Sequence, residues 1–213
     1  MTDSWAVRLQ AAAVRGDVPF RHWRISDVLP AELAGAAAGL DLTPPHVEDT
    51  AGRRETHNGS RWFFNAVMQA QFGCAATVAR AFQAPDMVAM WQSLCGVSLA
   101  GCSLRIEYCQ DTGGFWLEPH TDIGAKRFTM LIYLVQPPPG EAWGTDLLFP
   151  DGRLAERASG RANSSVIFVP GEDTWHGFAK RPITGVRRTL IINYVGPEWR
   201  ATQELCFPGQ PVA

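Results

Sequence analysis

The chain has 213 residues, of which 46% are hydrophobic and 19% are charged, and its formal net charge is −2. This length and composition predict one globular domain over residues 1–213. The near-neutral balance, without a basic block, argues against nucleic acid or a membrane surface as the main partner, since both need clustered Lys and Arg. No run approaches about 18 consecutive apolar residues, so we expect no transmembrane helix.

The N-terminus and the cysteines indicate a reducing compartment. The first residues, MTDSWAVRLQ, contain an early acid and no cationic segment, which does not fit a signal peptide. The five cysteines are an odd number without Cys-x-x-Cys spacing, so reduced thiols and a cytoplasmic location are expected. Of the 19 cations, 17 are arginines and only Lys126 and Lys180 are lysines.

The first hundred residues carry helical signals and one long loop. Residues 30–40 begin with a proline followed by an acid, which predicts a helix start. Residues 43–60 are polar and rich in turn formers, which predicts a loop. Residues 73–95 predict two helices separated at Ala84-Pro85-Asp86, because an interior proline removes a backbone donor.

From Ser103 onward the pattern changes to short strands. Apolar and β-branched runs, separated by Gly, Pro and Asp, occupy residues 104–109, 128–135, 146–150, 164–170 and 187–195. Many short strands without intervening helices predict a sandwich, barrel or jelly roll. We therefore expect a mainly β fold with flanking helices (α+β), in which the N-terminal helices pack on one sheet.

Two of the five histidines stand in a pattern that suits a metal ion. His120 and Asp122 are two residues apart, so in an extended strand their side chains project from one face. If His176 lies beside them, two imidazoles and a carboxylate form the facial triad that holds non-haem Fe(II). A surface ion pair is the alternative for His120 and Asp122. We expect structural or solvated roles for the other three histidines, which are His22, His46 and His57.

Arg187 and Thr189 share one face of the last predicted strand, and Arg188 lies on the other. A guanidinium binds a carboxylate in bidentate fashion, and a hydroxyl fills a remaining lone pair. The pair therefore predicts a receptor for a dicarboxylic cosubstrate. A surface ion pair is the alternative for Arg187.

Five blocks of sequence follow one another between residues 100 and 196. They are Tyr108-x6-Phe115-x4-His120-Thr121-Asp122, residues 128–134, residues 143–149, Trp175-His176-Gly177 and residues 185–189. In their order and spacing they resemble the 2-oxoglutarate- and Fe(II)-dependent oxygenase superfamily, in its prolyl 4-hydroxylase-like branch. The resemblance implies a double-stranded β-helix, a cupin-like jelly roll, over residues 101–196. Residues 1–100 would form a helical and loop support region and residues 197–213 a C-terminal tail.

The resemblance also implies ligands and cofactors. It assigns Fe(II) to His120, Asp122 and His176, and the distal carboxylate of 2-oxoglutarate to Arg187. O2 is the oxidant, and ascorbate is a candidate reductant. Thr189 resembles the hydroxyl partner of the arginine, and two tyrosines match positions where the family places a phenol near the cosubstrate. These are Tyr108 and Tyr133, for which core packing is the alternative.

Two departures from the prolyl 4-hydroxylases concern the cosubstrate anchor. These enzymes often use a lysine where this chain has Arg187, but neither Lys126 nor Lys180 lies at the matching strand position. An arginine anchor is therefore the better interpretation. The interval from His176 to Arg187 is slightly longer than the branch suggests, so Arg188 is kept as an alternative anchor.

The activity that the resemblance implies is hydroxylation of a C–H bond, coupled to oxidative decarboxylation of 2-oxoglutarate to succinate and CO2. Family halogenases lack the carboxylate that Asp122 supplies, which favours hydroxylation here; desaturation and cyclisation are alternatives. We expect a small-molecule substrate, such as an amino acid or a biosynthetic intermediate. The alternatives are a peptidyl side-chain hydroxylase and a non-enzymatic metal-binding jelly roll.

Candidate substrate contacts come from two regions. A cationic, polar group precedes an aromatic run at residues 62–64, which predicts a loop that closes over an anionic small molecule. Its members are Arg53, Arg54, His57, Asn58 and Arg61. The alternative is solvated arginines followed by a core strand. Near the metal blocks, Trp116, Trp143 and Trp175 are candidate pocket walls, with core packing as the alternative.

Overall fold

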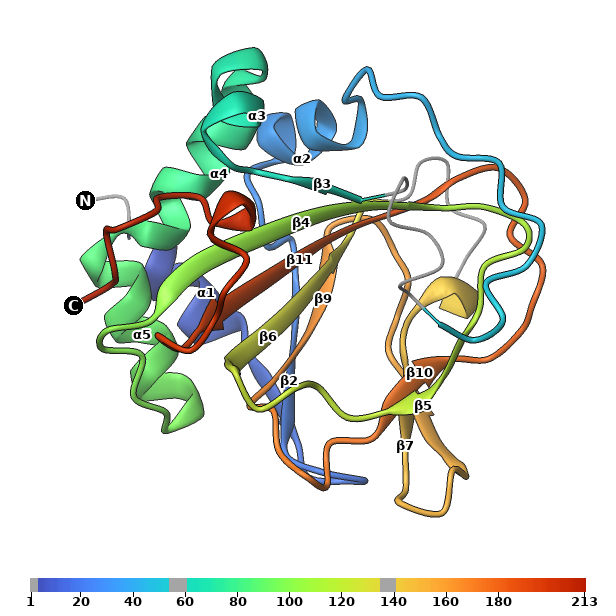
Figure 1. Ribbon diagram of the computed structural model, residues 1–213. Helices are drawn as coiled ribbons and strands as arrows, with labels where there is room; N and C mark the ends of the chain where they lie inside the picture. The colour runs from blue at the N-terminus through green and yellow to red at the C-terminus, as the bar shows by residue number, and fades with distance from the viewer. Residues whose placement is uncertain (1–3, 54–60, 135–140) are drawn as a thin grey trace.

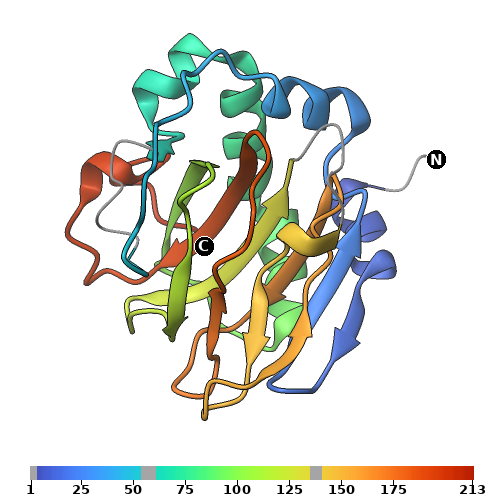
Figure 2. The same cartoon turned by 90° about the vertical axis from the view of Figure 1, so that its right-hand side faces the viewer.

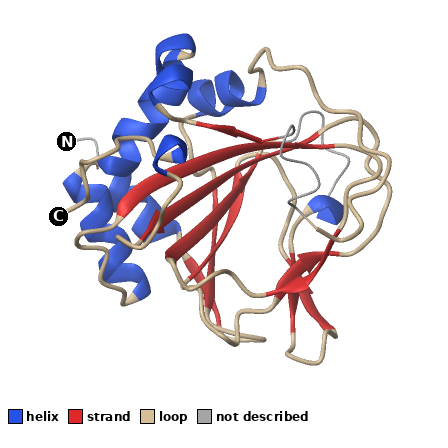
Figure 3. Cartoon of the chain, viewed as in Figure 1, coloured by secondary structure: helices blue, strands red, loops and turns tan. Residues whose placement is uncertain are grey.

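The computed structural model describes residues 4–53, 61–134 and 141–213, and it shows two β-sheets with a layer of helices (Figure 1). The helices cover the outer face of the larger sheet, and the smaller sheet lies on its other side (Figures 2 and 3). This arrangement confirms the mainly β, α+β expectation and the packing of helices on one sheet.

The larger sheet has seven antiparallel strands in the order β1-β2-β9-β6-β11-β4-β3. Their bounds are Val14–Gly16 (β1), His22–Ser26 (β2), Ser164–Phe168 (β9), Lys126–Tyr133 (β6), Arg187–Val195 (β11), Ser103–Asp111 (β4) and Arg61–Phe63 (β3). The sequence predicted β4, β6, β9 and β11, but not that the first hundred residues supply three strands to the same sheet.

The smaller sheet has four antiparallel strands in the order β5-β10-β7-β8. Their bounds are Leu117–His120 (β5), His176–Phe178 (β10), Asp146–Leu148 (β7) and Leu154–Arg157 (β8). Apolar side chains of both sheets meet between them, among them Leu131 and Val166 of the larger sheet and Leu147 of the smaller. The inner faces of the two sheets therefore pack against each other.

The helices pack on the outer face of the larger sheet. They are α1 (Trp5–Ala12), α2 (Ala31–Ala38), α3 (Ala66–Gln71), α4 (Gly73–Gln83) and α5 (Pro85–Cys95). The break between α4 and α5 confirms the prediction, because Pro85 occupies the first turn of α5, where its missing N–H costs nothing. Trp91 of α5 packs on Phe128 of β6. No helix in the described ranges is long and apolar enough to cross a membrane.

Alternation along β4 and β11 places polar side chains between the two sheets. On β11, Leu190, Ile192 and Tyr194 join the core under the helices. Odd-numbered positions of β11 face the other way, and two of them, Arg187 and Ile191, line a cavity between the sheets. On β4 the same alternation directs four side chains inward. They are Arg105, Glu107, Cys109 and Asp111.

Candidate metal and cosubstrate site

A cavity of about 410 Å³ lies between the inner faces of the two sheets. Its volume is within the range of small-molecule sites. Side chains of β5 and β10 in the smaller sheet and of β4, β6 and β11 in the larger sheet form its walls. His120, Asp122, His176 and Arg187 all contribute to this lining, so the cavity collects the groups that the sequence singled out.

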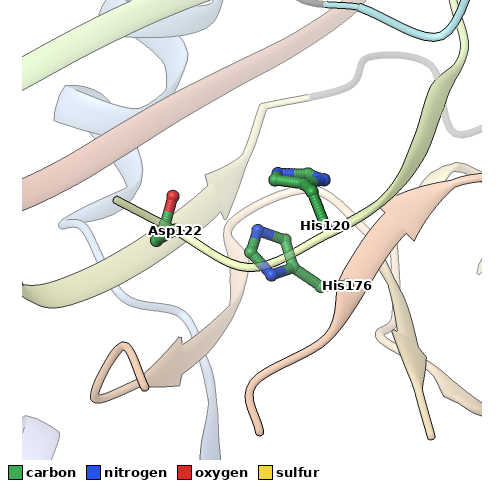
Figure 4. A group of neighbouring side chains, drawn as sticks. All are labelled: His120, Asp122 and His176. Carbon is green, nitrogen blue, oxygen red and sulfur yellow. The ribbon is translucent and has the colours of Figure 1, made fainter. Parts of the chain in front are cut away.

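His120 and His176 are direct cross-strand partners in the smaller sheet, with ring centroids 4.3 Å apart. Asp122 follows β5 on the chain that leads to β6 (Figure 4). One potential ligand atom from each of the three residues lies within 4.8 Å of the others. The pairing of the two segments, on which the predicted triad depended, is therefore present.

Both imidazoles are oriented by the backbone. The Nδ1 atoms of His120 and His176 lie 2.9 Å from the carbonyl oxygens of Glu118 and Thr174, respectively. A carbonyl only accepts, so each Nδ1 carries the proton and donates it. The Nε2 atoms are then unprotonated, which is the form that coordinates a metal ion in histidine ligands held by an outer hydrogen bond.

Asp122 is held ionised by its neighbours. Its Oδ1 atom pairs with Lys126, and its Oδ2 atom accepts a hydrogen bond of 2.7 Å from Thr129 Oγ1. Burial opposes ionisation, but the charge of Lys126 and the hydrogen bonds from Lys126 and Thr129 outweigh it and lower the pKa of the carboxyl. The side chain is thus an anion at neutral pH, as metal ligation requires.

His176 is held neutral. Burial lowers the pKa of its imidazole to about 4, against an opposing effect from the Asp122 charge. A neutral imidazole is the form that binds metal ions. Two neutral imidazoles and one carboxylate are the donor set of non-haem Fe(II) sites, and the residues present therefore fit that metal.

Arg187 lies at the start of β11 and is almost completely buried. Its Nε atom donates to the carbonyl oxygen of Trp143 at 2.7 Å, and its Nη1 atom pairs with Asp111. No described residue accepts a hydrogen bond from Nη2. The guanidinium lines the cavity with that group left for a ligand.

Thr189 supplies the orphaned polar atom beside this arginine. Its Oγ1 atom is buried and has no hydrogen-bond partner in the described part of the chain. A buried hydroxyl without a partner costs free energy, and a ligand carboxylate would remove that cost. The neighbouring Tyr133 hydroxyl donates to Thr145 Oγ1 at 2.8 Å. Burial raises the pKa of Tyr133, so it stays a neutral phenol.

Tyr108 is a correction to the sequence prediction. The structure does not bring it to the cavity, because it belongs to the β4 face that packs under the helices, where its ring stacks on Phe64. Burial raises its pKa to about 12. Arg188 also faces this side and lies beside the Tyr108 phenol, whose pKa it influences. The alternative anchor is thereby separated from the cavity by the sheet.

The tryptophans are less central than predicted. Trp116 lies beside a second, shallower cavity on the outside of the smaller sheet, where its Nε1 atom donates to Asp49 at 2.6 Å. Trp175 is half-buried outside the lining of the main cavity. Trp143 contributes its carbonyl oxygen to the orientation of Arg187.

Among the cationic group, Arg53 and Arg61 line the main cavity. Arg54, His57 and Asn58 lie outside the described residues. The predicted core strand is present as β3, but only in part, since Trp62 is 38% exposed. The remaining histidines have the expected roles: His22 is buried with Nδ1 on the Phe20 carbonyl, and His46 is exposed.

Sequence reasoning missed four polar residues that support the site. Lys126 and Thr129 hold Asp122, Asp111 holds Arg187, and Glu107 lies on the same inner face. The available signal was the alternation of β4, whose odd-numbered positions from Arg105 to Asp111 are predominantly polar within a strand of the core.

No family model and no curated protein sequence matches the chain. Solved structures do. A prolyl-4-hydroxylase from Pseudomonas putida is 17% identical, with a TM-score of 0.55 over 90% of this chain and 98% of that chain. A prolyl hydroxylase from Trichoplax adhaerens, in complex with a hypoxia inducible factor peptide, is 14% identical with a TM-score of 0.60, over 82% and 83% of the chains.

A third similar structure is the non-haem α-ketoglutarate-dependent epimerase SnoN of nogalamycin biosynthesis. It is 15% identical, with a TM-score of 0.51 over 98% of this chain and 95% of that chain. The chain therefore has the fold of the 2-oxoglutarate- and Fe(II)-dependent oxygenases, including prolyl 4-hydroxylases. At the level of the fold, the resemblance found in the sequence is confirmed.

Proposed function

We propose that this chain is a single-domain Fe(II)- and 2-oxoglutarate-dependent dioxygenase whose two sheets form a double-stranded β-helix. The observation that carries the proposal is that the His120, Asp122 and His176 cluster lines the same cavity as Arg187. A metal-storage or scaffold role needs no dicarboxylate anchor, so the anchor favours an enzyme over a non-enzymatic jelly roll.

The metal would be held by the Nε2 atoms of His120 and His176 and by a carboxylate oxygen of Asp122. Lys126 and Thr129 keep that carboxylate ionised and oriented. Three protein ligands leave coordination positions open for the cosubstrate and O2. Bound Fe(II), with 2-oxoglutarate and O2, supplies the oxidising power for hydroxylating an unactivated C–H bond and yields succinate and CO2.

Arg187 would bind the distal carboxylate of 2-oxoglutarate through its free Nη2 group, with Thr189 Oγ1 as the second donor. Asp111 and the Trp143 carbonyl fix the guanidinium plane in advance, so little side-chain entropy is lost on binding. The Tyr133 hydroxyl donates to Thr145 and keeps the wall of this subsite ordered. The buried surroundings exclude water from the carboxylate contact.

The cavity best fits a small prime substrate, such as an amino acid or a biosynthetic intermediate. Its volume of about 410 Å³ must hold the cosubstrate and the substrate together. Peptidyl side-chain hydroxylation is the second candidate, favoured by the peptide bound to the similar Trichoplax protein. The five cysteines form no disulfide, which supports our proposal of a cytoplasmic location.

The test is aerobic incubation with Fe(II), 2-oxoglutarate and ascorbate, followed by quantification of succinate. We expect slow uncoupled succinate formation without prime substrate, and its loss on chelation of the metal. A proline-containing peptide that stimulates succinate formation would favour the second candidate. No succinate, together with no 2-oxoglutarate binding by calorimetry, would refute the enzyme assignment.

A further inference from the structure

Four charged side chains form a cluster along another part of the same cavity. Arg105 Nη1 lies 2.9 Å from Glu107 Oε2, and Arg105 Nε lies 2.7 Å from Glu204 Oε2. Arg61 Nε lies 2.8 Å from Glu107 Oε1. All four residues line the cavity, and none of them has a part in the metal or cosubstrate contacts described above.

The cluster lies away from the cosubstrate anchor. Glu107 is four residues before Asp111 on β4, which at about 3.3 Å per residue separates the two positions by roughly 13 Å. It lies instead on the side of the metal ligand Asp122. A chain of hydrogen bonds joins them: Arg105 donates to Asn193 Oδ1 at 3.2 Å, and Asn193 Nδ2 contacts Thr129 Oγ1 at 2.9 Å. The cluster and Asp122 line the same cavity.

Arg105 is held on several sides. Its guanidinium is 5.0 Å or less from the ring centroids of Phe63 and Trp199, and its Nε and Nη1 atoms donate to Glu204 and Glu107. Burial works against its charge, but Glu107 and Glu204 outweigh this effect and raise its pKa. Arg105 therefore fixes the position of Glu107.

Within the described part of the chain, Arg61 has fewer hydrogen-bond partners for its guanidinium than Arg105. Its Nε atom forms an ion pair with Glu107 but is not aligned for a hydrogen bond, and no described residue accepts a hydrogen bond from its Nη1 or Nη2 atom. Its side chain is 19% exposed and borders the cavity. A guanidinium held by an ion pair at the wall of a cavity can bind a ligand carboxylate there in bidentate fashion.

Energetics favour a binding role for this cluster. Arg105 and Glu107 are 4% and 2% exposed, and burying such charges costs several kcal/mol per ion before their attraction is counted. Apolar residues of similar volume would hold the sheets together as well or better. The two arginines and two glutamates of the cluster balance in number. Arg105 pairs with both carboxylates, whereas Arg61 pairs with Glu107 alone and shares it with Arg105.

We propose that Arg61 binds a carboxylate of the prime substrate, with Glu107 and Arg105 as positioning residues that orient its guanidinium. The inference rests on the proposed function and narrows its substrate class to small carboxylic acids. The carboxylate end of the substrate lies on β3 and β4, and the carbon to be oxidised faces the triad.

The test uses the metal- and cosubstrate-loaded enzyme and a panel of the proteinogenic L-amino acids and simple monocarboxylic acids, each paired with its primary amide. The amide retains size and shape but loses the charge. We expect at least one acid to raise succinate formation above the uncoupled rate and its amide not to do so. Amides that stimulate as well as acids, or a panel in which no acid stimulates, would overturn the inference.

Variants test the assignment of residues with the stimulating acid. Arg61→Gln should raise KM for that acid by about ten- to a hundred-fold with a smaller change in kcat, since a bidentate charge-assisted contact is lost. Arg61→Lys should recover part of the loss. The matched control is Arg24→Gln, which removes a surface arginine that pairs with Glu156 outside the cavity. A KM within two-fold of wild type in Arg61→Gln would contradict the assignment.

The variant Glu107→Gln tests whether Glu107 orients Arg61 for substrate binding or only stabilises the fold. The amide keeps the shape of the side chain but holds Arg61 less firmly, so KM for the acid should rise several-fold. A purely structural role would lower the melting temperature and leave KM unchanged, and that result would remove Glu107 from the proposal. Uncoupled succinate formation in the wild type, with stimulation by neutral compounds only, would refute this inference alone. Absence of both succinate and 2-oxoglutarate binding would refute the proposed function with it.

Discussion

Arg187 and Asp111 are register partners at the adjoining ends of β11 and β4, and their side chains form an ion pair that is 2% and 1% exposed. A buried pair contributes little net stability, because desolvation offsets the attraction. It does fix the direction of the guanidinium, which the Trp143 carbonyl fixes from a second side. The pair therefore prepares Arg187 for a ligand and also makes it costly to remove.

This dual role gives the first prediction. Arg187→Gln should lower the free energy of unfolding by about 3–5 kcal/mol, because Asp111 is left buried without its partner. Adding Asp111→Asn should recover most of that stability but not the binding of 2-oxoglutarate. Urea unfolding and calorimetric titration with 2-oxoglutarate measure the two effects. Arg188→Gln is the control, since Arg188 lies on the opposite face. Weakened 2-oxoglutarate binding in that control alone would move the anchor to Arg188.

Thr189→Val gives the second prediction. The buried hydroxyl has no partner in the described part of the chain, so its replacement by a methyl group should leave stability unchanged or raise it by about 1 kcal/mol. If the hydroxyl binds the cosubstrate, KM for 2-oxoglutarate should rise by about ten-fold. The matched control is Thr77→Val, in which a hydroxyl bound to the Gly73 carbonyl is lost on α4, away from the cavity. An unchanged KM in Thr189→Val would exclude the contact.

The sequence predicted the direction of a site side chain correctly where strand alternation alone determines that direction. The spacing of His120 and Asp122 placed two groups on one side of a strand end, and alternation along β11 separated Arg187 and Thr189 from Arg188. The structure agrees with each of these placements. Strand alternation was enough for these predictions because the residues of each pair are only two positions apart in the sequence.

Other relations depend on pairing between distant segments, which one sequence does not encode locally. Nothing in residues 22–26 indicates that β2 pairs with β9, more than 130 residues later. On β4, alternation places Tyr108 among the apolar positions with Leu104 and Ile106, whereas the resemblance implies a position near the cosubstrate. A sequence does not distinguish polar positions that face solvent from polar positions that line a charged cavity. Arg105 and Glu107 were missed for that reason.

Removal of one ligand gives the third prediction. His120→Ala should weaken binding of Mn(II), used as a redox-inert substitute for Fe(II), by about ten-fold or more, because one of three protein ligands is lost. His46→Ala is the control, since His46 is exposed and outside the cavity. Metal affinity is measured by calorimetry and by electron paramagnetic resonance of the bound ion. Equal affinities for both variants would exclude His120 as a ligand.

The protonation of His176 gives the fourth prediction, on the stability of the metal-free protein. Its pKa is lowered by burial from the ordinary value of 6.5 to about 4, so the unfolded chain takes up a proton at higher pH than the folded chain. The stabilisation is complete above pH 6.5 and is lost as the pH falls toward 4, with a total on the order of 3 kcal/mol. Urea unfolding in the presence of a chelator, from pH 8 to about pH 4, measures it. His176→Gln should remove most of this slope, whereas His46→Gln should retain it; equal slopes in the two variants would show that another group is responsible.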